Sequence, residues 1–103
     1  MREGDYQSKL IKTIKRRFPG CIVIKGPSDY IQGIPDVLIL FNDHWAALEC
    51  KRSLKEVNKS KIHEPNQDYY VSLMNRMSFA SFISPEIEEE VLDAVQQSFE
   101  SGR

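Results

Sequence analysis

Cysteine and long apolar runs are both scarce in this chain of 103 residues, and each absence excludes a class of protein. Cys21 and Cys50 have no Cys or His at the spacing of a zinc site, so we expect two buried free thiols. No stretch reaches the roughly 18 apolar residues that a membrane span needs. The first residues lack the apolar segment of a secretion signal. We therefore expect an intracellular, cytoplasmic protein that has no membrane contact.

The chain does have the composition of one soluble globular domain over residues 1–103, with 41% hydrophobic and 28% charged residues. Its net charge of −1 hides an asymmetry. Residues 1–63 carry 12 Lys and Arg against 7 Asp and Glu, whereas residues 64–103 carry 2 against 8. The basic part suits a polyanionic partner, although ordinary solvated helix surfaces produce the same asymmetry.

Apolar periodicity and turn residues predict the element order α-β-β-β-α-β-α. The predicted elements are a helix over 4–18, strands over 21–25, 35–41 and 45–51, a helix over 66–77, a strand over 78–83 and a helix over 85–99. Strand 35–41 is apolar on both faces, which favours a central position, and Asn42-Asp43 closes a hairpin. We expect a layered α/β fold in which helices flank a mixed four-stranded sheet.

Three further expectations concern local detail. The helix over 66–77 should bury a stripe made of Tyr70, Leu73, Met74 and Met77. Ser84 should cap the last helix, with Pro85 at its first position. Segment 52–63 is polar, basic and weakly periodic, so it is predicted as a loop or an irregular arm.

The run Gly33-Ile34-Pro35-Asp36, followed by Glu49-Cys50-Lys51, carries the chemistry. Glu49 and Lys51 are two apart in a strand, so their side chains leave the same face. A buried Glu is costly unless it is paired or coordinated. Asp36 alone is typical of a turn, and Lys51 could serve as a plain ion-pair partner. Together they suit a site that holds a divalent cation and a phosphate.

In such a site Mg²⁺ or Mn²⁺ would be held by Asp36 and Glu49, with the Cys50 backbone carbonyl as a further ligand. The metal would polarise a phosphoryl oxygen and lower the pKa of a bound water. Lys51 would orient that water or offset charge in the transition state. Glu3 and Gln67 each lead the inward stripe of a helix, so each either reaches this site or is an exposed helix end.

Taken in order, Glu3-Gly-Asp-Tyr-Gln7, Gly33-Ile-Pro-Asp36, Glu49-Cys-Lys51 and Gln67 resemble the motifs of the virus-type replication-repair nuclease (VRR-NUC) domain. That family belongs to the PD-(D/E)xK nuclease superfamily and is related to Holliday junction resolvases. The resemblance implies a restriction-endonuclease-like fold, with Asp36 and Glu49 as metal ligands and Lys51 as the catalytic lysine. It also implies that Glu3 is an additional acidic site residue and Gln67 a supporting one. Stand-alone members resemble structure-specific endonucleases that act as homodimers, and the analogy suggests a phage origin.

Basic residues around this run are candidates for phosphate contacts, although a solvated surface is the ordinary explanation for any single lysine. The candidates are Lys9 and Lys12 in a cluster with Arg16 and Arg17, then Lys25, Arg52, Lys55 and Lys59. His44 and His63 have no evident acid–base partner. Tyr30 and Trp45 either stack on bases or serve packing.

The sequence therefore predicts a Mg²⁺- or Mn²⁺-dependent endonuclease that cuts DNA, with branched DNA as substrate, a homodimer as the active form and no organic cofactor. Two alternatives stay open. One is a restriction-type or general repair nuclease that acts on linear or single-stranded DNA. The other is a nucleic-acid-binding domain that has no catalysis, because a fold does not fix a function.

Overall fold

The centre of the structure, a computed structural model that describes residues 2–26, 30–59 and 65–101, is a mixed sheet of four strands. The strands lie in the order β1-β2-β3-β4. Their bounds are β1 Ile22–Lys25, β2 Val37–Phe41, β3 His44–Cys50 and β4 Phe79–Ile83. β1, β2 and β3 pair antiparallel, and β4 adds to β3 in parallel. The predicted layered fold and the central place of β2 are confirmed.

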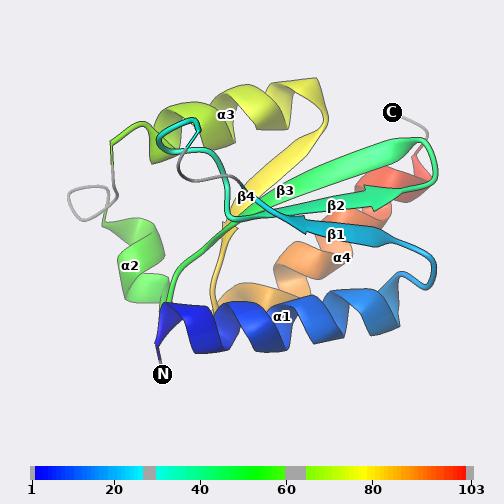
Figure 1. Ribbon diagram of the computed structural model, residues 1–103, viewed down its shortest axis with the longest axis horizontal. Helices are drawn as coiled ribbons and strands as arrows, with labels where there is room; N and C mark the ends of the chain where they lie inside the picture. The colour runs from blue at the N-terminus through cyan, green and yellow to red at the C-terminus, as the bar shows by residue number, and fades with distance from the viewer. Residues whose placement is uncertain (1, 27–29, 60–64, 102–103) are drawn as a thin grey trace.

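Helices cover both faces of this sheet (Figure 1). They are α1 Glu3–Arg17, α2 Leu54–Asn58, α3 Gln67–Met77 and α4 Glu88–Glu100, with a 3-10 turn, η2, over Pro85–Ile87. The predicted element order is confirmed, with α2 as an addition. None of the helices in the described part of the chain is long and apolar enough to cross a membrane.

The larger part of the core lies between the sheet and the pair α1 and α4. Tyr6, Leu10, Ile14 and Phe18 form the predicted stripe of α1, and each is at most 3% exposed. They pack on the β2 and β3 side chains that point to this face and on the apolar side of α4. Burying this aliphatic and aromatic surface is the main source of stability for the fold.

The opposite face of the sheet is covered by α3 through small side chains. Val71 of α3 packs on Ala47 of β3 and Ala80 of β4. The predicted stripe of α3 is wrong at its end, because Met77 is 65% exposed, whereas Gln67 and Val71 are buried. Gln67 leads the inward side of α3, as its spacing predicts, so a polar side chain is brought under the helix.

Three other expectations need correction. Segment 52–63 is not an irregular loop throughout, because residues 54–58 form α2, which Ser53 caps through a hydrogen bond from the Glu56 N–H. Residues 60–63 lie outside the described part. Ser84 makes no side-chain cap bond, and the α-helix starts only after η2. Cys21 precedes β1 and is half-buried, while Cys50 is buried, and both are free thiols.

The hairpin between β2 and β3 forms as predicted. Asn42 takes a left-handed backbone conformation with φ 56°, which Asn tolerates better than most residues. The turn pairs Phe41 with His44 and sets the register along both strands. This register brings the start of β2 beside the end of β3, where the candidate site lies.

Candidate metal and active site

Two glycines set the position of Asp36, the residue just before β2. The Gly26 N–H donates to the Asp36 carbonyl at 2.6 Å, and a Cβ on Gly26 would come within 2.1 Å of the Pro35 carbonyl oxygen. Gly33 has φ +91°, and a Cβ there would meet Asn66 at 2.6 Å. Only glycine allows both approaches. The loop that carries Asp36 is therefore held between the end of β1 and the start of α3.

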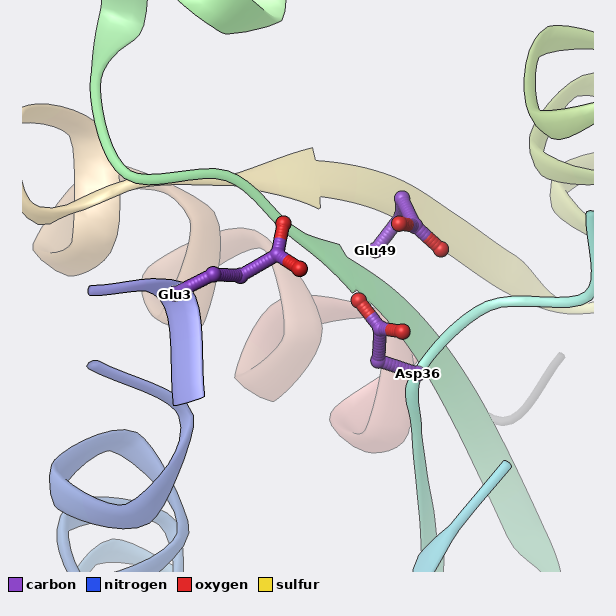
Figure 2. Close-up of side chains that lie close together, drawn as sticks. All are labelled: Glu3, Asp36 and Glu49. Atoms are coloured by element: carbon purple, nitrogen blue, oxygen red, sulfur yellow. The ribbon is translucent and has the colours of Figure 1, made fainter. Parts of the chain in front are cut away.

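Three carboxylates meet at this end of the sheet. Glu3 comes from the first residue of α1, Asp36 from the residue before β2 and Glu49 from β3 (Figure 2). One oxygen of each lies within 4.8 Å of the others. Glu3 is exposed and Asp36 half-buried, whereas Glu49 is 1% exposed. The structure thus brings the three acidic residues of the predicted site together from segments far apart in sequence.

Gln67 joins Glu49 to Lys51. Its Nε2 donates to Glu49 Oε2 at 2.8 Å, and its Oε1 accepts from Lys51 Nζ at 2.8 Å. Both Gln67 and Lys51 are 6% exposed. The side-chain amide is suited to this place because it can donate at one end and accept at the other. Gln67 therefore lies at the site rather than at an exposed helix end.

Asp36 is held from the backbone of β3. Its Oδ2 accepts from the Cys50 N–H at 3.0 Å. The Cys50 side chain belongs to the opposite, apolar face, as predicted. Cys50 lies two residues past Leu48, where the antiparallel register with β2 ends, and its N–H is turned toward the Asp36 side of β3. The prediction that the Cys50 carbonyl is a cation ligand is compatible with this orientation and stays a prediction.

The electrostatics of the site oppose full ionisation. Burial, then the Asp36 charge and a hydrogen bond with Asp36, raise the pKa of Glu49 to about 9, against the opposing effect of Lys51. Burial and the nearby carboxylates also raise the pKa of the Cys50 thiol, and a hydrogen bond with Gln7 partly offsets this. A carboxyl placed in this way keeps its proton near neutral pH unless another positive charge arrives.

The donor set fits a hard divalent cation. Glu49 Oε1 is fully buried and accepts no hydrogen bond from an N–H or hydroxyl group of the described residues. An orphaned buried oxygen is costly, and a cation next to the three carboxylates would relieve that cost. Glu3, Asp36 and Glu49 offer oxygen ligands, which Mg²⁺ and Mn²⁺ prefer. These three residues are the ones that would hold the metal.

The predicted phosphate-contact residues are scattered around this centre. Lys25 ends β1 and pairs with Val37, the residue after Asp36, so it is the nearest to the site in strand register. Arg52 bonds Glu56 at 2.5 Å and is therefore engaged within the chain. Lys55 and Lys59 are exposed on and just after α2. Lys9 and Lys12 line a groove beside α1.

Sequence reasoning did not assign roles to Gly26 and Gln7. The contact of Gly26 with Pro35 joins residues that periodicity cannot pair. Gln7 follows Glu3 by four positions on the same side of α1, and this spacing is a signal that could have placed it at the site. Comparisons with protein-family models, with curated proteins and with solved structures found no match to this chain.

Proposed function

We propose that this chain is a metal-dependent nuclease that hydrolyses DNA phosphodiester bonds. The observation that carries the proposal is the buried Glu49, which lies in one cluster with Asp36 and Glu3 while Gln67 links it to a buried lysine. A purely structural carboxylate in this position would be expected to have its oxygens satisfied. A site that must accept a cation leaves one of them without a donor.

The residues of the chain have separate tasks in this proposal. Asp36 and Glu49, with Glu3 at the exposed edge, hold the cation. When bound, a divalent cation polarises a phosphoryl oxygen and makes a coordinated water more acidic. Lys51 places a fixed positive charge where negative charge develops on the phosphoryl group, and Gln67 restricts its position. The buried setting strengthens both effects because solvent screens them weakly.

Branched DNA is the proposed substrate and a homodimer the proposed active form. A two-fold dimer would present two equal sites, which suits paired cuts in a four-way junction that is itself nearly symmetric. The ordered motifs from Glu3 to Gln67 support this choice over linear duplex. A monomer with one site would suit flaps or single strands instead.

The test is cleavage of a labelled four-way junction, a flap and a linear duplex in Mg²⁺ or Mn²⁺. Asp36→Asn should lose activity at least a hundredfold, because it removes a charged ligand at the reacting centre. Asp43→Asn is the matched control, since Asp43 is 90% exposed at the opposite end of the same hairpin. Mn²⁺ should raise the melting temperature of the wild type and leave that of Asp36→Asn nearly unchanged.

Each outcome of the cleavage and binding assays favours a different candidate function. Symmetric junction cuts that need Asp36 support the branched-DNA nuclease. Cutting of the linear duplex that needs Asp36 supports the restriction-type or repair reading. DNA binding that occurs without cutting and without stabilisation by Mn²⁺ would refute the enzyme and leave a binding domain.

A further inference from the structure

A second site candidate is a groove of about 500 Å³ along the outer side of α1. Its walls are α1 on one side and the start of the C-terminal helical segment, Pro85 and Glu88, on the other. Lys9, Lys12 and Arg16 contribute three cations to it from α1. These positions are three and four residues apart, so they lie on one side of the helix.

The three cations are not neutralised by acidic residues of the described chain. No ion pair joins Lys9, Lys12 or Arg16 to a carboxylate among the residues for which the structure gives positions. Arg16 instead donates to the Thr13 hydroxyl at 3.3 Å. The acid in the groove, Glu88, accepts from the Tyr6 hydroxyl at 3.0 Å. The groove therefore presents positive charge that is available to a ligand.

The neighbouring residue Arg17 gives the contrast. It bonds Asp93 and donates to Gln96 at 3.0 Å, so its charge is engaged by α4. The two adjacent arginines thus differ, because Arg17 joins α1 to α4 and Arg16 lines the groove. The groove cations therefore differ from Arg17 in having no acidic partner in the described part of the chain, and from the equally unpaired Lys15 in lining the groove.

We infer that this groove binds backbone phosphates of the nucleic-acid strand that leads away from the candidate active site. Glu3 lies at the start of the same helix, and Lys9, Lys12 and Arg16 follow it by about 9, 14 and 20 Å along the axis, at about 1.5 Å per residue. At 3.6 residues per turn they lie about 180–240° around the axis from Glu3, so the strand would pass around α1 between the site and the groove. Charges spread over this length match a repeating polyanion better than one isolated phosphate. The inference rests on the proposed function for the choice of DNA as ligand.

The test measures binding in EDTA, where cleavage cannot occur. Fluorescence anisotropy of a labelled DNA duplex and of the four-way junction is recorded over a series of salt concentrations. Lys12→Gln should weaken binding and reduce the salt slope by about 0.9, the value expected for one lost phosphate contact. The triple variant K9Q/K12Q/R16Q should reduce the slope by up to about three times as much.

Lys15→Gln is the matched control, because it removes the same charge from the same helix at an exposed position that does not line the groove. It should leave the slope nearly unchanged. Equal effects of Lys12→Gln and Lys15→Gln would overturn the inference, since only net charge would then matter. Absence of DNA binding by the wild-type protein would also overturn the inference. Polyglutamate serves as a polyanion without phosphate, and a triple variant that loses affinity for polyglutamate but not for DNA would likewise overturn it.

The two proposals can fail separately. Groove-dependent binding without metal-dependent cutting would refute the nuclease and keep the phosphate groove. Cutting that persists with unchanged KM in the triple variant would keep the nuclease and refute the groove. If both hold, the triple variant should raise KM and leave kcat nearly unchanged, because the groove binds flanking DNA equally before and during reaction.

Discussion

The two ends of the β2–β3 hairpin bury different kinds of side chain. At the turn end, Phe18, Phe41 and Phe99 pack with ring centroids 5.4–5.7 Å apart, and His44 stacks on Phe99 at 6.0 Å. At the other end, Glu49 and Lys51 are buried, and one Glu49 oxygen accepts no hydrogen bond from an N–H or hydroxyl group of the described chain. The turn end is apolar and closely packed, whereas the other end buries charged groups beside one another.

The two ends make opposite contributions to the stability of the fold. Aromatic rings at such distances gain from both burial and mutual contact. Buried carboxylates close to one another lose free energy unless a proton or cation joins them. The aromatic end of the hairpin therefore stabilises the fold, and the carboxylate end is the one that the proposed cation would stabilise.

The largest loss of stability is expected when an aromatic ring is removed at the turn end. Phe99→Ala should destabilise the protein by about 3–5 kcal/mol, because it empties a ring position that is buried against Phe18 and Phe41. Denaturant unfolding measures the loss. Tyr30→Ala, at a ring that is 83% exposed, should change stability by less than about 0.5 kcal/mol. If the two substitutions cost the same, the turn end is not the stabilising end.

A smaller effect is expected from Gln67 at the carboxylate end. Gln67→Ala should destabilise by about 1–3 kcal/mol, because Lys51 Nζ and Glu49 Oε2 both lose a buried partner. It should also lower metal-dependent cleavage by about 10–100-fold, as loss of a supporting group does at metal sites. Gln97→Ala, on the exposed side of α4, is the control. Full activity of the Gln67 variant would show that Lys51 does not depend on this bond.

The pH of the solution perturbs the carboxylate end without a change of residue. The pKa of Glu49 is raised from the usual 4.5 to about 9, so the folded chain keeps a proton that the unfolded chain has lost. Its contribution to stability is complete below about pH 4.5 and is lost as pH rises through about 9. Metal-free protein should therefore become less stable across this interval, as urea unfolding at several pH values would reveal.

Two further measurements test whether Glu49 causes the pH dependence of stability. Glu49→Gln should flatten the pH dependence in the metal-free protein, because an amide stays neutral throughout. Mn²⁺ should restore stability to the wild type at high pH and do little for Glu49→Gln. An unchanged slope in the Glu49 variant would mean that another group controls it.

The elements and the acidic residues of the site could be predicted from sequence because their signals are local. The four-residue repeat from Tyr6 to Phe18 and the apolar run 37–41 each record the surface they bury. Glu49 stands out because a carboxylate inside an apolar strand must be explained chemically. Such reasoning needs no knowledge of the distant chain.

The errors concern contacts between distant segments. Met77 fits a helical stripe, yet α3 packs on the sheet through Val71 over Ala47 and Ala80, and this leaves the last turn uncovered. Gly26 meets Pro35 only because β1 and β2 are aligned. The groove on α1 gains its second wall from Pro85 and Glu88, about 70 residues later in the chain. Periodicity carries no record of such pairings.

The close approach of Gly33 to Asn66 couples the Asp36 loop to local opening of α3. No side chain fits between the loop that carries Asp36 and the residue before Gln67. Opening the first turn of α3 therefore removes one of the contacts of that loop and withdraws the amide from Glu49 and Lys51 in one event. The Gly26 and Cys50 N–H groups still hold Asp36, so local opening of this kind separates the lysine from the carboxylates and leaves the three acidic residues in place.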